Sequence, residues 1–276
     1  MSELIDLHCH LLPGIDDGSP DMPTSIRMAR LALSDGISQI ACTPHIFPGI
    51  YENTAKSIRN ATERLRLALQ DAGVPLQLHY ASDTHMMPEL ISRLQQKTVP
   101  TFSGGRYFLL EPPHRVAPPH FEEFVFKVVA SGYMPIITHP ERLHWVDDHY
   151  PVFKRMAENG VWMQITSGSV TGRFGKKAQY WAERMLDDGI VHILATDAHN
   201  LGRRAPLMME AVEVAGRWVG REEAKRLVEE RPTAVLNNLP SDGITPIPAL
   251  QRVHAGKDTK SIYARIRRKL HFLIKP

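Results

Sequence analysis

The sequence contains little cysteine and no long apolar run, which argues against a disulfide-stabilised protein and against a protein that spans a membrane. Only Cys9 and Cys42 occur among 276 residues, so no disulfide framework is expected. No stretch of eighteen or more apolar residues is present, which argues against a transmembrane helix. The first ten residues lack a basic segment followed by an apolar one and do not predict a signal peptide. Together these absences favour a cytoplasmic protein.

An excess of positive charge is also missing outside the last part of the chain. The net charge is +3, but residues 240–276 hold eight Lys or Arg against Asp242 and Asp258, a local excess of +6. The remaining body therefore carries −3 and does not predict nucleic-acid binding. Histidine, by contrast, is abundant: there are fourteen copies, many in short clusters with Asp, Glu or Pro.

Short apolar runs alternate with helical patterns along most of the chain. Seven runs are typical of buried strands: Leu4–Leu7, Ser38–Thr43, Leu76–Ala81, Tyr107–Leu110, Met134–Thr138, Val161–Ile165 and His192–Ala195. The helical patterns between them are Ser25–Ser34, Thr54–Ala72, Pro88–Gln96, Phe121–Ser131, Val152–Asn159 and Gly175–Asp187. Strand followed by helix, repeated about seven times, predicts an α/β fold with a parallel sheet.

Residue types that bind metals occur at or just after the ends of six of the seven predicted strands. They are His8 and His10, His45, Asp83 and His85, Glu111, His139, and Asp197 and His199. In a β/α barrel such strand ends meet on one face, where active sites lie. An open sheet brings together only the strands near its switch point. Six contributing strands therefore favour a closed or nearly closed barrel.

The composition of this set predicts a metal centre. His8 and His10 lie on the same side of an extended strand and can reach one ion, while Cys9 should point into the packing. A single histidine at a strand end is more often structural than a metal ligand. The inference therefore depends on the occurrence of potential ligands at the ends of six strands. Imidazole and carboxylate without thiolate suit Mn, Fe, Zn or Mg. The ligands are too many for one ion, which predicts two or three ions that activate water.

Two arginines extend the predicted centre. Arg142 lies three residues after His139, and Arg203 and Arg204 follow the Asp197 cluster closely. Guanidinium groups beside metal ions suit bidentate phosphate binding. We expect this role for Arg142 and Arg204, with Arg203 the weaker candidate. The alternative is that each arginine caps a helix or pairs with a surface acid.

The order of motifs resembles a known superfamily. The segments DLHCHLLPGIDDG, TPH, LLEP, THPER and DAHN are similar to those of the polymerase-and-histidinol-phosphatase superfamily. More narrowly, they resemble bacterial manganese-dependent protein tyrosine phosphatases of capsular and exopolysaccharide loci. The resemblance extends from about residue 5 to about residue 239. It implies a distorted (β/α)7 barrel over residues 1–239, followed by a separate basic tail over residues 240–276.

The resemblance also implies roles for individual residues. Arg142 and Arg204 match the family's phosphate-contacting arginines, and Asp17 and His199 would join them in catalysis. Asp83 departs from the pattern, because close relatives place a bridging glutamate there. The shorter side chain requires an inward shift of the backbone or weakens the bridge, and His85 could compensate. The implied metal ligands are His8, His10, Asp17, His45, Asp83, Glu111, His139, Asp197 and His199.

The leading interpretation is a manganese-dependent protein tyrosine phosphatase. The resemblance implies a phosphotyrosine protein as substrate, namely a bacterial tyrosine kinase that regulates capsule or exopolysaccharide synthesis. A small-molecule phosphatase, such as one acting on histidinol phosphate, is the alternative enzyme. An inactive metal-binding module is a third interpretation. A thiol phosphatase is excluded, because Ile15 and Pro48 stand where the arginine of a Cys-x5-Arg loop would follow Cys9 and Cys42.

The basic tail suggests a different kind of contact. Four apolar residues at helical spacing form one face, beside a dense run of basic side chains. The four are Ile262, Ile266, Leu270 and Leu273, and the basic residues are Arg265, Arg267, Arg268 and Lys269. The segment would dock on the barrel as a helix, form a partly disordered chain end, or lie as a helix on an anionic membrane surface near a membrane-bound kinase. The sequence leaves the oligomeric state open, a homo-oligomer included.

Overall fold

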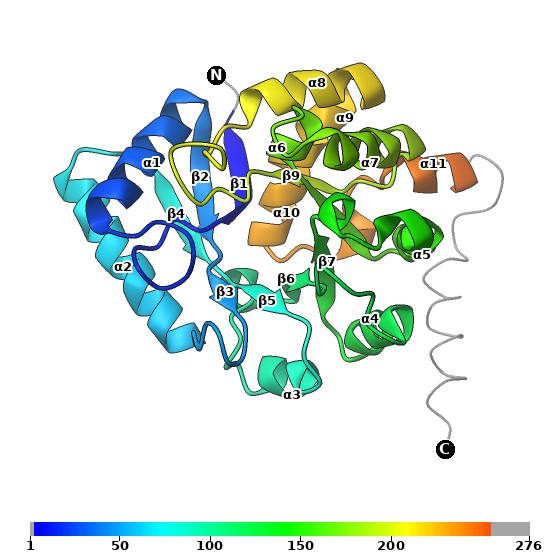
Figure 1. The fold of residues 1–276 in the computed structure, drawn as a ribbon, viewed down its shortest axis with the longest axis horizontal. Coiled ribbons are helices and arrows are strands. Elements are labelled where there is room, and N and C mark those ends of the chain that lie inside the picture. The colour runs from blue at the N-terminus through cyan, green and yellow to red at the C-terminus, as the bar shows by residue number, and fades with distance from the viewer. Residues whose placement is uncertain (1–2, 255–276) are drawn as a thin grey trace.

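A computed structural model describes residues 3–254, and it confirms the predicted alternation of strands and helices (Figure 1). The strands are β1 (Leu4–Cys9), β2 (Ile37–Cys42), β3 (His45–Ile46), β4 (Gln77–Tyr80), β5 (Asp83–His85), β6 (Tyr107–Glu111), β7 (Met134–Thr138), β8 (Trp162–Thr166) and β9 (Ile193–Ala195). The α-helices are α1 (Met22–Ser34), α2 (Ala55–Asp71), α3 (Leu90–Gln95), α4 (Phe121–Ala130), α5 (Val146–Glu158), α6 (Ser167–Val170), α7 (Lys176–Asp188), α8 (Met209–Val219), α9 (Arg221–Lys225), α10 (Arg231–Leu236) and α11 (Pro248–His254). Short helical turns are η1 (Phe102–Gly104), η2 (Pro140–Arg142), η3 (Arg226–Glu230) and η4 (Ser241–Gly243).

All strand pairs are parallel, and they form two sheets. One sheet has the order β1-β2-β4, and the other has the order β3-β5-β6-β7-β8-β9. Only two residues separate β2 from β3 and β4 from β5, so the chain passes directly from one sheet to the other at both places. At the opposite edges, a parallel bridge joins Cys9 to Ala198, and the Asp197 amide donates to the His8 carbonyl at 2.8 Å. The first strand therefore lies beside the last.

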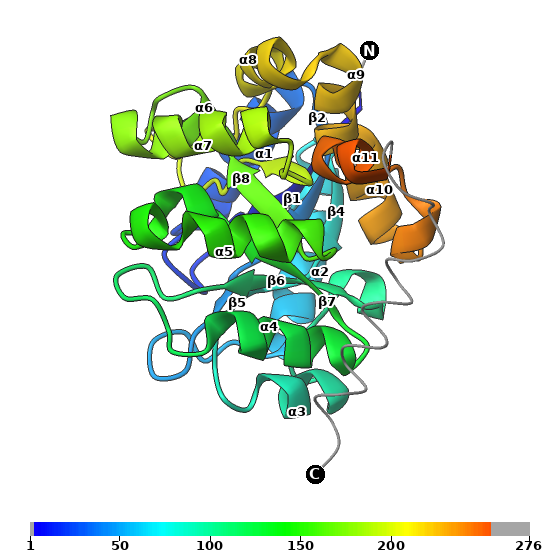
Figure 2. The ribbon, with the colours of Figure 1, turned by 90° about the vertical axis from the view of Figure 1, so that its right-hand side faces the viewer.

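The strands are buried on both faces, as parallel strands covered by helices should be. In β1, β6 and β8 every residue is buried. Figure 2 shows α4, α5 and α7 following one another along the outer side of the strands. This arrangement leaves the loops after the strands as the place where polar groups can gather.

Local signals explain why the helices begin where they do. The Asp21 side chain accepts from the Thr24 amide at the start of α1, and Thr54 and Ser57 form a reciprocal capping box at the start of α2. Helix α5 begins at Val146, six residues before the predicted start, and contains Pro151. The prediction was wrong at this end because a proline within the first two turns interrupts few helical hydrogen bonds.

The chain after the last strand packs on the body as far as the structure describes it. The Arg231 side chain is buried, pairs with Glu223 at 2.7 Å and donates to the Thr245 carbonyl. Ile247 is also buried, and the Ala249 amide donates to Gly189. The proposed amphipathic helix over residues 262–273 lies outside the described residues. Among residues 3–254, no helix combines the length and the apolar character needed to cross a membrane.

Candidate metal centre

The structure brings together all nine predicted ligands at the carboxyl ends of the strands. His8 lies on β1, His45 opens β3, Asp83 opens β5 and Glu111 ends β6. The remaining five lie in loops that follow strands: His10, Asp17, His139, Asp197 and His199. All except Asp17 and His45 are buried.

Backbone geometry at two of these positions is unusual. His139 and Asp197 adopt positive φ angles of 36° and 50°, a left-handed conformation that costs energy for residues other than glycine. His139 comes directly after β7, and Asp197 comes two residues after the end of β9. An extended backbone at either position would continue in the direction of the strand. The strained conformation instead directs both side chains into the cluster, as is common at functional sites.

His8 and His10 form the clearest part of a metal site. Their Nδ1 atoms lie 2.8 Å from Gln164 Oε1 and 2.7 Å from Asp16 Oδ2, so each Nδ1 carries the proton. The two Nε2 atoms lie 3.2 Å apart, with Asp197 Oδ1 at 3.3 and 3.4 Å. Two nitrogens that are each about 2.0–2.1 Å from one ion lie roughly 3.0–3.4 Å apart. The separation therefore suits either a proton shared between the two rings or one cation bound by both.

Asp83 links this pair of histidines to a second group of ligands. Its Oδ2 atom is 3.4 Å from His8 Nε2 and 3.4 Å from His45 Nδ1, and His45 Nδ1 is also 3.4 Å from Glu111 Oε2. Within residues 3–254, neither Asp83 oxygen accepts a hydrogen bond, although both are buried. A buried carboxylate without donors is costly unless a cation binds it. The aspartate thus reaches both ligand groups despite its short side chain.

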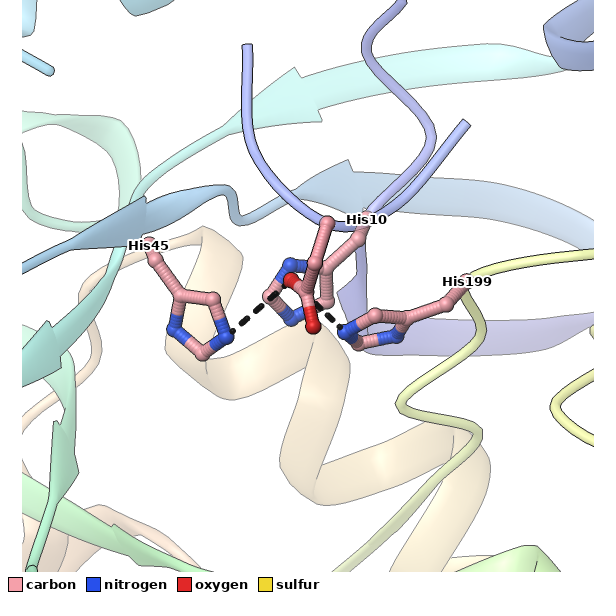
Figure 3. Close-up of side chains that lie close together, drawn as sticks. His10, His45 and His199 are labelled. Carbon is pink, nitrogen blue, oxygen red and sulfur yellow. Dashed lines mark ion pairs between the residues drawn. The ribbon is translucent and has the colours of Figure 1, made fainter. Parts of the chain in front are cut away.

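A third group of ligands lies at the more open side of the cluster. Figure 3 shows His10, His45 and His199 converging from different segments of the chain. The Asp17 carboxylate is 3.4 Å from His45 Nε2 and 3.3 Å from His199 Nε2. His10, Asp17, His45 and His199 together can surround one ion. Among the described residues, five overlapping groups of this kind occur, two of which contain His139, and together they fit the predicted two or three ions.

The electrostatics of the cluster indicate that it requires positive charge. Burial opposes protonation of His8, but the carboxylates of Asp83 and Asp197 outweigh it and raise its pKa to about 9. Burial likewise opposes protonation of His45, yet hydrogen bonding to Glu111 and the charge of Asp83 raise its pKa to about 10. Without a metal, the carboxylates therefore draw protons onto imidazoles that would otherwise be neutral near pH 7. Bound metal ions would displace these protons.

The two predicted arginines lie against one ligand. Arg142 pairs with Asp197 Oδ2, and Arg204 Nη2 donates to the same oxygen at 2.7 Å. The Asp197 Oδ1 atom remains directed at the histidines. The Arg142 guanidinium also lies over the Phe174 ring, 4.8 Å from its centre. Both arginines line a cavity of about 450 Å³ that is also lined by Arg203, but Arg203 donates to the Arg173 carbonyl instead of to a predicted ligand.

Three polar residues at the centre were missed from the sequence. Asp16 and Gln164 fix the orientation of His10 and His8 through the hydrogen bonds above. His114 lies on the loop after β6, with its Nε2 atom 3.3 Å from Glu111 Oε1. Gln164 could have been found, because it is the polar residue in the middle of the apolar β8 strand. His114 carries no comparable signal.

His85, which was suggested to compensate for the short Asp83 side chain, lies beside the predicted ligand Glu111. Its Nδ1 atom is 3.6 Å from Glu111 Oε2, and its ring stacks on Phe47 with the centres 3.9 Å apart. Cys9, by contrast, is buried in the hydrophobic core as expected. The strand periodicity therefore predicted the orientation of residues 8–10 correctly.

The fold and the site define a class: an α/β protein of parallel strands with a buried histidine and carboxylate centre beside arginines. The sequence profile of the CpsB/CapC family, described as capsular polysaccharide synthesis proteins, matches residues 4–237. The chain belongs to this family. The match covers most of the chain and includes every predicted ligand.

Characterised relatives and solved structures agree with this membership. Tyrosine-protein phosphatase YwqE of Bacillus subtilis is 32% identical over 234 residues, covering 85% of this chain and 92% of YwqE. Tyrosine-protein phosphatase CpsB of Streptococcus pneumoniae is 24% identical over 238 residues, covering 84% of this chain and 98% of CpsB. A crystal structure from work on these two proteins, which are described as metal-dependent tyrosine phosphatases, superposes with a TM-score of 0.82 at 32% identity. It covers 86% of this chain and 96% of the solved one.

Proposed function

We propose that this protein is a metal-dependent tyrosine phosphatase. The observation that carries the proposal is the convergence of five overlapping ligand groups with two arginines that contact Asp197. The family relatives named as tyrosine phosphatases support the same activity. The substrate class is a phosphotyrosine protein, and the reaction is hydrolysis of a phosphate monoester.

The chain's own groups hold the reactants in place. The nine ligands would hold two or three divalent ions, with Asp83 between two of the groups. When bound, such ions activate water as the nucleophile and neutralise charge on the phosphoryl oxygens. Arg142 and Arg204 present guanidinium donors beside the ions, where they would bind the remaining phosphoryl oxygens bidentately. Asp16 and Gln164 accept from the Nδ1 atoms of His10 and His8, which would leave the Nε2 atoms available to hold the ions.

Finer features of the proposal concern the fold, the metal and the partner. The hydrogen-bonded contact between β1 and the segment after β9 supports a distorted (β/α)7 barrel formed by both sheets. Oxygen and imidazole ligands together are compatible with manganese. A capsule-related tyrosine kinase in the cytoplasm is the partner that the family's association with capsular polysaccharide synthesis favours.

The substrate class is tested by comparing rates on three phosphate esters. Manganese-loaded protein should hydrolyse phosphotyrosine peptides with a kcat/KM at least tenfold above that for histidinol phosphate or a phosphoserine peptide. An Asp197→Ala protein serves as the inactive control for contaminating phosphatases. A preference for histidinol phosphate would instead assign a small-molecule phosphatase.

A further inference from the structure

Two cavities open beside the metal centre, and they differ in chemistry. The first, described above, is lined by Arg142, Arg203, Arg204 and Lys177. The second has a volume of about 540 Å³ and a largely apolar lining. Its inner end is formed by His45, His85, Glu111 and His114, and its outer walls by Phe47, Ile50, Tyr51 and Val116. A ligand in the second cavity therefore reaches the metal ligands directly.

The outer walls of this cavity expose two large apolar side chains to solvent. Ile50 is 60% exposed and Val116 is 71% exposed. They are two of the seven large hydrophobic side chains that stand exposed among residues 3–254, and both border this cavity. Two exposed apolar groups facing one cavity beside a reaction centre are typical of a ligand site.

The wall that carries Ile50 is held in a fixed shape. Phe47 and Tyr51 exchange both backbone hydrogen bonds, at 3.0 and 2.8 Å, and close a tight turn over Pro48 and Gly49. Gly49 has a φ of 82°, which the turn requires and which glycine adopts without strain. Tyr51 stacks on the ligand His45 at 5.6 Å, so the turn is anchored to the metal centre.

Four of the planar rings that line this cavity form two stacked pairs. The Phe47 and His85 rings are stacked with an interplanar angle of 7°, and the Tyr51 and His45 rings with one of 14°. In the first cavity, by contrast, the face of Phe174 is already engaged by Arg142. That cavity is dominated by cations, which suit the phosphate itself rather than an aromatic group.

We propose that the cavity between Ile50 and Val116 is the specificity pocket for the aromatic ring of the substrate. This inference rests on the proposed function and adds the residues that select an aryl ester. The phosphate would lie at the metal centre and the arginines, and the ring would lie between the turn over residues 47–51 and the loop over residues 113–116. An alkyl phosphate would leave these apolar walls in contact with water.

Binding of two non-hydrolysable phosphonates tests the proposal without catalysis. The metal-loaded protein is titrated calorimetrically with phenylphosphonate and methylphosphonate. Half-burying a phenyl ring predicts that phenylphosphonate binds about tenfold more tightly. In the double variant Ile50→Ala/Val116→Ala this preference should fall to about twofold or less, with methylphosphonate binding unchanged. Leu67→Ala, which removes an equally exposed side chain from α2, is the matched control and should keep the full preference.

The outcomes separate this proposal from the proposed function. A double variant that keeps the tenfold preference, or that loses both ligands equally, overturns the ring pocket. The ring pocket would also be overturned if the double variant kept the phosphonate preference but had a raised KM for a phosphotyrosine peptide. In that case Ile50 and Val116 would contact the peptide that flanks the phosphotyrosine, and not its ring. If the wild-type protein prefers phenylphosphonate but hydrolyses no phosphotyrosine, the proposed tyrosine phosphatase activity is refuted and the proposal of a ring pocket is retained. If neither phosphonate binds the wild type, the ring pocket is overturned, while the rates on phosphotyrosine peptides still decide the proposed function.

Discussion

Gln164 offers a sensitive test of the proposed metal centre. It contacts the proposed ligand His8 but would not itself bind a metal ion, so its substitution changes only the orientation of that ligand. Its Oε1 atom accepts from His8 Nδ1 at 2.8 Å, and both side chains are completely buried. This bond holds the proton on Nδ1 and leaves the Nε2 lone pair directed at the proposed ion. Gln164→Leu removes the acceptor while keeping a side chain of similar size.

The expected loss follows from the geometry of that bond. Once His8 binds a cation, its Nδ1 proton becomes more acidic, and the hydrogen bond behaves as one to a charged group. Such a bond is worth about 1.5–3 kcal/mol. Because about 1.4 kcal/mol corresponds to a factor of ten, metal affinity should fall roughly 10- to 100-fold. The fold should survive, since among the described residues the Gln164 Nε2 atom has no acceptor to lose.

The assay is a manganese titration of metal-stripped protein, following hydrolysis of p-nitrophenyl phosphate and measuring ion content by mass spectrometry. The Gln164→Glu variant is the matched control, because a carboxylate still accepts from Nδ1 and should keep the wild-type affinity or exceed it. Far-ultraviolet circular dichroism verifies the fold of each variant. If Gln164→Leu binds manganese within about twofold of the wild type, then His8 is not oriented for a metal and the reasoning fails.

Three further predictions concern the ligands and the arginines. His139→Ala or Asp197→Ala should each reduce the rate by at least about 100-fold and lower the ion content of a folded protein, and normal metal content with normal activity in either would disprove the assignment. Arg142→Ala or Arg204→Ala should lower kcat/KM for phosphate esters about 100-fold, roughly the effect of losing one charge-stabilising donor. Elemental analysis should find the metal content of these variants unchanged, and a loss of metal would contradict a phosphate-binding role. Asp83→Glu should keep activity because a longer carboxylate still spans both ligand groups, whereas Asp83→Ala should lose one ion; equal ion content in wild type and Asp83→Ala would show that this carboxylate binds none.

Strand periodicity and the order of motifs were sufficient to predict which side chains lie together in the cluster. His8 and His10 share one side of a strand, and this local fact requires no knowledge of the rest of the chain. The cluster as a whole could be predicted because parallel strands end on the same side of a sheet. The two short strands β3 and β5 were missed, since each is separated by only two residues from a strand that was predicted.

Features that depend on loop closure could not be predicted. Asp16 reaches His10 because the Ser19 amide donates to the His10 carbonyl and folds the intervening loop back on β1. That approach leaves no room at Gly18, where a Cβ atom would lie 2.3 Å from the His10 carbonyl oxygen. Likewise, burial of Arg231 depends on the distant Glu223 and on the Thr245 carbonyl. Neither contact has a local signature in the sequence.

Metal dependence of phosphotyrosine hydrolysis is the most direct test of the account. Protein stripped with a strong chelator and exhaustively dialysed is assayed for phosphate release from a phosphotyrosine peptide, and divalent ions are then added back singly. We predict that the stripped protein has less than about 1% of the original rate and that manganese restores it best, with two or three ions bound per chain. Full activity of the stripped protein in the presence of chelator would contradict the account.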